Sequence, residues 1–209
     1  MVVPHFELID ATLELNETLI LKDVSLTIQN QTLTCISGEN GSGKSCLISI
    51  LLKLHTCTRG TQISTFNKRE LCYIPAQPFF FDTERVYTCI RLMKSLYATS
   101  MDTLIHVMDS LNLDYHEIRQ KRFGDLSSGM KQKLNILPLF LDNLSIFFLD
   151  ELTQNLDTES IHAIETRINH LISTQKTIVM IDHNNGFMNQ LHSKNKEHYR
   201  CENKTVIKL

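Results

Sequence analysis

Residues 38–45 combine residue types and a spacing that can bind a phosphate chain. They read Gly38-Glu39-Asn40-Gly41-Ser42-Gly43-Lys44-Ser45 and match the pattern G-x-x-x-x-G-K-[ST]. In such a loop, successive backbone N–H groups and the positive end of the following helix surround the phosphates. The glycines let the backbone approach the ligand closely. We therefore expect a nucleoside triphosphate to bind at Gly38, Glu39, Asn40, Gly41, Ser42, Gly43, Lys44, Ser45 and Cys46.

Two adjacent carboxylates follow an apolar run later in the chain. Residues 146–149 are continuously apolar, as in a buried parallel strand, and Asp150 and Glu151 come directly after them. Ligand sites of parallel α/β sheets lie at this end of the strands. Mg²⁺ keeps several waters, so Ser45 and Asp150 are sufficient protein ligands. Neighbouring side chains diverge in β geometry, which leaves Glu151 to face the attacking water. A plain polar strand end is the other interpretation.

A third segment, Leu126-Ser127-Ser128-Gly129-Met130, precedes this strand by about twenty residues. Ser127 can cap a helix that begins near Gly129 and leave free N–H groups for an anion. Taken alone, the segment indicates only an ordinary helix cap.

The elements that must position these residues follow a β, then helical, then α/β order. Alternation predicts two antiparallel strands at 5–15 and 19–28, and residues 84–143 have helical periodicity. A helix is expected at 157–173, from Asp157, and the tail is expected to form a hairpin that turns at Glu202-Asn203. Further strands are expected at 33–36, 71–74, 146–149 and 177–181.

Composition limits the class of protein. The 209 residues fit one domain, and a net charge of −2 with 42% hydrophobic residues excludes disorder and a basic nucleic-acid-binding surface. No apolar run reaches the roughly 18–20 residues that span a bilayer, and residues 1–7 do not resemble a signal peptide. Six cysteines without a C-x-x-C pair indicate core thiols in a reducing compartment.

In this order the motifs resemble the ATP-binding subunits of ABC (ATP-binding cassette) transporters, over essentially the whole chain. The motifs that carry the resemblance are the loop 38–45, Gln77 after a strand, the signature-like 126–130, the run ending in Asp150-Glu151, Asn155-Leu156-Asp157, and His183. The resemblance implies an α/β fold with a P-loop NTPase (RecA-like) core, an N-terminal antiparallel β-subdomain and an inserted α-helical subdomain. The single domain 1–209 would divide into a core and β-subdomain at about 1–78 and 144–209, and a helical subdomain at about 79–143.

The resemblance also implies catalytic roles. Lys44 would neutralise the β- and γ-phosphates, and Ser45 and Asp150 would ligate Mg²⁺. Gln77 would touch the metal or the attacking water, and its loop would couple the nucleotide to a membrane partner. Glu151 would be the general base and His183 would hold the γ-phosphate. Such positioning and charge neutralisation is what phosphoryl transfer requires. Gln77 as ordinary turn chemistry and His183 as a solvated side chain are the plainer interpretations.

Partners follow from the same resemblance. Two cassettes would close head-to-tail around two ATP molecules, with Ser127 and Gly129 of one copy capping the γ-phosphate bound by the other. A separate integral membrane permease would carry the substrate, and no nucleic-acid partner is expected. The chain would then be cytoplasmic and peripheral on the inner face of the cell membrane. Phe79-Phe80-Phe81 is either core or part of the permease interface.

The sequence departs from the family pattern at several positions. No aromatic residue lies near Leu13 to Leu15, where adenine usually stacks, so GTP stays open as a substrate. Ser128 and Met130 replace the usual Gly and Gln, and Leu152 stands where Pro is frequent. Pro138 falls in the expected signature helix, which should bend or end there because an interior proline costs roughly 3 kcal/mol.

Two narrower interpretations remain, and a third is rejected. Ser128-Gly129-Met130 and the short helical block are most similar to the heme-exporter type of cytochrome c maturation, with an unspecified import or export system as the wider alternative. A soluble ABC-type ATPase of repair or translation is the second function; its relatives carry coiled coils or two cassettes. A GTPase is rejected, because residues 67–70 (N-K-R-E) come too early for the motif N-K-x-D and have Glu for Asp.

Overall fold

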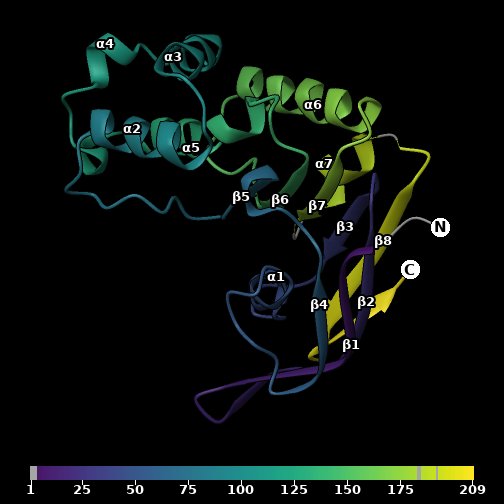
Figure 1. Ribbon diagram of the computed structural model, residues 1–209. Helices are drawn as coiled ribbons and strands as arrows, with labels where there is room; N and C mark the ends of the chain where they lie inside the picture. The colour runs from purple at the N-terminus through teal and green to yellow at the C-terminus, as the bar shows by residue number, and fades with distance from the viewer. Residues whose placement is uncertain (1–3, 183–184, 192) are drawn as a thin grey trace.

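The computed structural model describes residues 4–182, 185–191 and 193–209, whose strands form two sheets (Figure 1). An antiparallel sheet of order β2-β1-β4 is made of β1 (Pro4–Leu15), β2 (Thr18–Gln29) and β4 (Arg59–Ser64). A larger sheet of order β5-β6-β7-β3-β8-β9 is made of β5 (Leu71–Ile74), β6 (Ile146–Asp150), β7 (Thr177–Ile181), β3 (Leu33–Ser37), β8 (Lys196–Glu202) and β9 (Thr205–Lys208). In the larger sheet β9 is antiparallel to β8, and the other pairs are parallel.

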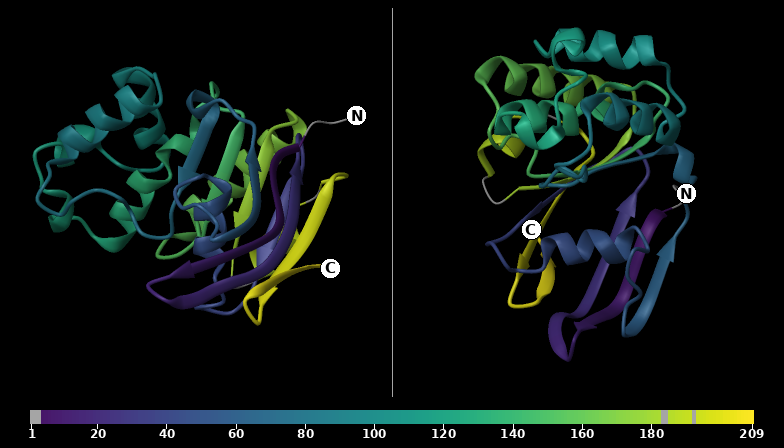
Figure 2. Two further views of the ribbon diagram at one scale, coloured as in Figure 1. Left: turned by 60° about the horizontal axis from the view of Figure 1, so that its bottom comes forward. Right: turned by 90° about the vertical axis from the view of Figure 1, so that its left-hand side faces the viewer.

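The helices fall into a group at one end of the molecule and others along the larger sheet (Figures 1 and 2). The α-helices are α1 (Lys44–Leu51), α2 (Val86–Leu96), α3 (Met101–Ser110), α4 (Tyr115–Ile118), α5 (Ser128–Asn135), α6 (Thr158–Ser173) and α7 (Asn185–Gln190). Short 3₁₀ segments are η1 (Lys68–Glu70), η2 (Phe123–Asp125) and η3 (Leu137–Phe140). Among the described residues, no helix combines the length and apolar character needed to cross a bilayer.

Strand β6 explains why the middle of the sheet is buried on both faces. Successive side chains of a strand point to opposite faces, and here Phe147 and Leu149 join the core under the helical group and α6. Ile146 and Phe148 join a second core with α1 and the antiparallel sheet, where Phe148 meets Phe6 edge-on at 5.0 Å between ring centroids. Each such side chain contributes roughly 1.5–3 kcal/mol by burial.

The parallel register brings the ends of three strands to one edge. β3 pairs with β7 and β7 with β6, so that Asp150 lies opposite Ile181. The segment after β3, the carboxylate at the end of β6 and the residue after β7 therefore share this edge. The residues predicted to do chemistry at 38–45 and at 150 meet here.

The structure agrees with the strands, the tail hairpin and the helical block predicted from the sequence. Helix α5, which begins at the predicted signature segment, ends at Asn135, and Pro138 lies in the 3₁₀ turn η3, as the cost of an interior proline predicts. Strand β4 was not predicted. Its sequence RGTQIS has a largely exposed, polar pattern and gives no periodic apolar signal.

Candidate functional site: a phosphate-binding loop facing a buried carboxylate

The loop 38–43 lies between β3 and α1, the context that the motif requires. Gly43 is the N-cap of α1 with a left-handed φ of 101° and provides no side-chain cap, so it leaves the first N–H groups of the helix open to a ligand. A Cβ on Gly43 would lie 2.9 Å from Cδ2 of Leu21, and one on Gly38 would collide with the carbonyl oxygen of Cys201. Glycine is therefore favoured at Gly43 by its backbone angle, and at Gly38 by both its backbone angle and the lack of space.

Lys44 lies across the mouth of this loop. Its Nζ donates hydrogen bonds of 2.8 Å to the carbonyl oxygens of Gly38 and Glu39, and the residue is only 6% exposed. The cation is thus held by neutral acceptors and not by a carboxylate. It can exchange one of them for a phosphate oxygen, which is the stronger, charge-assisted acceptor.

Ser45 joins the loop to the end of β6. Its Oγ donates a hydrogen bond of 3.1 Å to Oδ2 of Asp150, which is 3% exposed. Burial raises the pKa of Asp150 to about 6, opposed by the hydrogen bond from Ser45 and assisted by the charge of Glu151. A hydroxyl and a carboxylate oxygen at one point are the hard ligands that Mg²⁺ takes.

Glu151 lies beyond the strand and not in it. The chain turns at Glu151, whose φ is 51°, and its N–H donates to the carbonyl of Ile181 at 3.0 Å. Its carboxylate accepts a hydrogen bond from Nε2 of Gln154. The sequence predicts that β alternation separates the side chains of Glu151 and Asp150. In the structure the strand has already ended, and the turn at Glu151 sets the position of its side chain instead.

The predicted signature segment begins helix α5 at the surface. Ser127 is the N-cap, and its Oγ accepts a hydrogen bond of 3.2 Å from the N–H of Met130. Ser127 and Ser128 are exposed. A Cβ on Gly129 would lie 3.0 Å from the carbonyl oxygen of Asn155, so glycine allows α5 to approach the segment after β6.

Two further contacts tie α5 to that segment. Nζ of Lys133 lies 2.7 Å from Oδ2 of Asp157, which also caps α6. This lysine and the α6 cap hold the pKa of Asp157 well below its usual range. The buried Gln132 donates from Nε2 to the carbonyl of Leu152 at 3.0 Å. The signature helix is thereby fixed to the segment that leaves the Asp150-Glu151 strand end.

Asn135 ties the same helix to the segment that carries Gln77. It is 1% exposed and donates from Nδ2 to the carbonyl of Pro75 at 2.8 Å. Gln77 is exposed and lines a hollow of ≈ 490 Å³ together with Phe81, Ser128 and Asn155. In this chain Gln77 therefore lies beside the start of the signature helix.

The remaining predicted residues are Cys46 and His183. Cys46 is half-buried, and burial raises the pKa of its thiol. His183 lies outside the described residues. Asp182, which precedes it, is 7% exposed, and its charge raises the pKa of Asp150 further.

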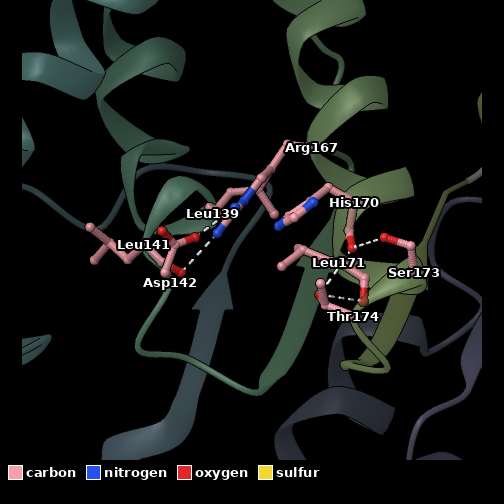
Figure 3. A network of polar contacts seen from close by, with 8 residues as sticks. All are labelled: Leu139, Leu141, Asp142, Arg167, His170, Leu171, Ser173 and Thr174. Carbon is pink, nitrogen blue, oxygen red and sulfur yellow. Dashed lines mark hydrogen bonds and ion pairs between the residues drawn. The ribbon is translucent and has the colours of Figure 1, made fainter.

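Arg167 on α6 is a structural residue that the sequence did not reveal (Figure 3). It donates hydrogen bonds of 2.9 Å from Nε to the carbonyl of Leu139 and from Nη2 to that of Leu141, and its Nη1 lies 2.8 Å from Oδ1 of Asp142. These contacts cap the 3₁₀ turn that follows α5. The sequence does offer a signal for Asn135, because it is a polar residue inside the apolar run 134–141. It offers no comparable signal for Arg167.

A glycine-rich loop after one strand of a parallel sheet, with a carboxylate at the end of the next strand but one, defines a P-loop nucleotide-binding domain. A family model described as ABC transporter matches residues 21–154. The chain belongs to this ABC transporter family, and it is an ATPase domain of that family. The predicted α/β fold is confirmed by a structure of the ATP-binding subunit of an ABC transporter (TM-score 0.82, 22% identity, 98% of this chain and 89% of that one). A dimeric bacterial ABC transporter cassette also matches, with a TM-score of 0.78, 19% identity and 96% of each chain.

Some curated relatives are much longer than this chain, and others are of similar length. The chain is 30% identical to a "Probable ABC transporter ATP-binding/permease protein" of Haemophilus influenzae, over 82% of this chain and 34% of that protein, and so spans about a third of its length. It is 28% identical to the "High-affinity zinc uptake system ATP-binding protein ZnuC" of Bacillus subtilis, over 84% of this chain and 82% of that one.

Proposed function

We propose that this chain is the ATP-binding and ATP-hydrolysing subunit of an ABC transporter, coupled to a separate membrane subunit. The observation that carries the proposal is the hydrogen bond from Ser45 to Asp150, which joins the phosphate-binding loop to a buried carboxylate. Lys44 binds the β- and γ-phosphates, and residues 38–46 hold the triphosphate through backbone N–H groups.

Ser45 and Asp150 are the ligands proposed for Mg²⁺, with Gln77 as a further contact to the metal or the attacking water. When bound, the ion supplies positive charge against the phosphate oxygens. Glu151 takes the proton of the attacking water, and Gln154, hydrogen-bonded to its carboxylate, orients it. His183 is proposed to hold the γ-phosphate.

The active form is proposed to contain a second cassette, either a copy or a close paralogue. Ser127 is the N-cap of helix α5, and this end of the helix, at Ser127 and Ser128, is exposed. Such a terminus can cap the γ-phosphate held by the other copy. Closure of the two cassettes would drive transport, and hydrolysis would release them.

The membrane partner is proposed to dock at the helical subdomain, 79–143, against a core formed by about 1–78 and 144–209. Phe79 and Phe81 are 40% and 76% exposed there, although Phe80 is buried, so the aromatic cluster is both surface and core. This would place the chain on the cytoplasmic face of the membrane.

The membrane partner is proposed to determine which substrate is transported. Ser128-Gly129-Met130 and the short helical block favour heme export, as in cytochrome c maturation, whereas the relative ZnuC is named for zinc uptake. Purification from detergent-solubilised membranes, followed by identification of the associated proteins, tests the proposal. A permease is the expected companion. Recovery with ribosomes or nucleic acid, and without a membrane protein, would support a soluble ABC-type ATPase instead.

A further inference from the structure

One residue of the C-terminal hairpin, Cys201, contacts the phosphate-binding loop at two points. Strand β8 runs parallel to β3 with Arg200 opposite Ser37, so Cys201 lies where β3 passes into the loop. The residue is fully buried. Its carbonyl oxygen lies so close to Gly38 that a Cβ there would collide with it, and its thiol donates a hydrogen bond of 2.9 Å to the carbonyl oxygen of Ser42. Cys201 therefore holds both the start and the end of the loop.

The Ser42 carbonyl belongs to the same peptide unit as the N–H of Gly43. A trans peptide unit is planar, and its C=O and N–H bonds point in opposite directions. Because the Cys201 thiol holds the Ser42 oxygen towards β8, the Gly43 N–H points away from β8. Gly43 is the N-cap of α1, and within the described part of the chain its N–H has no acceptor. This N–H is therefore available to a phosphate oxygen.

Two other carbonyl oxygens of the loop are held by contacts within the loop and the helix that follows it. Nζ of Lys44 donates to those of Gly38 and Glu39, and the Glu39 oxygen also accepts from the N–H of Ser42 at 3.2 Å. The Ser42 oxygen is different, because its donor lies 159 residues later in the chain. When Lys44 exchanges a carbonyl oxygen for a phosphate oxygen, the contact from Cys201 can persist, because it involves no ligand atom.

Strand β8 is a fixed support for this thiol. The hydroxyl of Ser37 donates to the carbonyl of Tyr199 at 3.3 Å, and the N–H of Lys22 on β2 donates to the carbonyl of Lys204 at 2.7 Å. The hairpin is thus attached to β3 and to the antiparallel sheet, and Figure 2 shows β8 and β9 beside β1 and β2. Burial raises the pKa of the Cys201 thiol, which therefore stays protonated at neutral pH and remains a donor.

We propose that Cys201 is a positioning residue of the phosphate site: its thiol fixes the Ser42–Gly43 peptide with the N–H of Gly43 directed at the triphosphate. The proposal rests on the proposed triphosphate site at 38–46 and adds to it a residue that does not touch the ligand. Without this donor the peptide can rotate, since glycine at position 43 permits many backbone angles. The Ser42 oxygen would then face the phosphate, and an acceptor opposes an anion. The loss therefore falls on the phosphates, and it is the same for ATP and for inorganic tripolyphosphate.

Cys201→Ala and Cys201→Ser separate the hydrogen bond from the packing. The first removes the donor, and the second replaces the thiol with a hydroxyl donor. Cys201→Val also lacks a donor but fills the space, so it repeats the test if the void left by alanine unfolds the chain. Cys72→Ala is the matched control: Cys72 is as deeply buried, on β5 of the same sheet, but belongs to the core under the helical group and not to the core around α1.

Affinity is measured with magnesium by competition against a fluorescent ATP analogue, with ATP and inorganic tripolyphosphate as competitors. Cys201→Ala and Cys201→Val should each weaken both competitors about threefold to tenfold, as for the loss of one hydrogen bond. Cys201→Ser should bind both within about twofold of the wild type. Cys72→Ala should also bind within about twofold, even where its thermal unfolding shows that it is less stable than the wild type.

Four results would overturn the inference and leave the proposed function intact. They are wild-type affinity in the variants without a donor, an equal loss in Cys201→Ser and Cys201→Ala, a comparable loss in Cys72→Ala, and a loss for ATP without one for tripolyphosphate. If the wild type bound neither ATP nor tripolyphosphate, the proposed function itself would fail.

Discussion

Ser45 and Asp150 are 105 residues apart in the chain, and Ser45 Oγ donates a hydrogen bond of 3.1 Å to Asp150 Oδ2. The bond closes the site by joining the first turn of α1 to the end of β6. It also partly compensates a carboxylate that is almost fully buried. The buried negative charge of Asp150 therefore lowers the free energy of unfolding.

Asp150→Asn should stabilise the chain at pH 7 in the absence of nucleotide and magnesium. Because burial raises the pKa of Asp150 to about 6, the native state binds its proton more tightly than the unfolded state, whose pKa is about 3.9. The contribution of protonated Asp150 to the free energy of unfolding is therefore fully present below about pH 4 and is lost as the pH rises through 6. The variant should gain about 1–3 kcal/mol at pH 7 and progressively less towards pH 4.

Urea denaturation of both proteins at several pH values measures this difference. Asp109→Asn, on the exposed face of α3, is the control and should leave the free energy of unfolding nearly unchanged. A gain for Asp150→Asn that is the same at pH 4 and pH 7 would rule out the burial of a charge as its cause.

Asp157 serves two contacts that substitutions can separate. Oδ1 accepts from the N–H of Ser160 as the cap of α6, and Oδ2 pairs with Lys133. Asp157→Ser keeps a capping oxygen and loses the ion pair, whereas Asp157→Ala loses both. Asp157→Ala should therefore cost about 1–2 kcal/mol of unfolding free energy, and Asp157→Ser clearly less.

The pKa shift of Asp157 has the opposite sign to that of Asp150, so the pH dependence of its contribution to stability is also opposite. The pKa of Asp157 is lowered, so its contribution is present above an unfolded pKa of about 3.9 and is lost only at lower pH. The cost of Asp157→Ala should be equal at pH 5 and pH 8 in chemical denaturation. Equal stability of the Ser and Ala variants would assign the effect to the ion pair and not to the cap.

Asn135→Ala should loosen the link between the signature helix and the segment that carries Gln77. The substitution leaves the carbonyl of Pro75 without its donor and opens a small void, at a cost of about 1–3 kcal/mol. Asn169→Ala, on the exposed face of α6, is the control and should not destabilise. If the two variants unfolded at the same denaturant concentration, Asn135 would not be a structural link.

Much of the site could be predicted because its signals are local. The loop 38–45 is contiguous, and Asp150 follows a short continuous apolar run, which is typical of a buried strand. The contacts of Gln132, Asn135 and Lys133 could not be predicted. Each joins helix α5 to a segment distant in sequence, and residue spacing does not indicate which distant segments come into contact.

The same contrast holds for the fold. Strands β6 and β7 are buried at every position, and continuous apolar runs predict them. Strand β4 forms because β1 offers it an edge, and its own residues carry no apolar alternation. The end of helix α5 was predictable because Pro138 acts through local backbone chemistry.

Lys44→Ala should remove most nucleotide affinity while the chain stays folded. The side chain is buried at the mouth of the loop, and its loss removes a charge-assisted contact to the phosphates. We expect binding to weaken about tenfold to a hundredfold in a fluorescent-nucleotide titration. Lys68→Ala, at an exposed position, should bind as the wild type does. Wild-type affinity in Lys44→Ala would exclude the loop as the phosphate site.

The most direct test is the molar mass of Glu151→Gln in solution, measured by light scattering during size-exclusion chromatography with ATP and magnesium. If Glu151 is the general base and each site is completed by a second cassette, this variant should hydrolyse ATP at least about a hundredfold more slowly. It should then elute with ATP as a dimer of twice the 24.1 kDa chain mass, and as a monomer with ADP. A monomer in both nucleotides, with hydrolysis at the wild-type rate, would contradict the account.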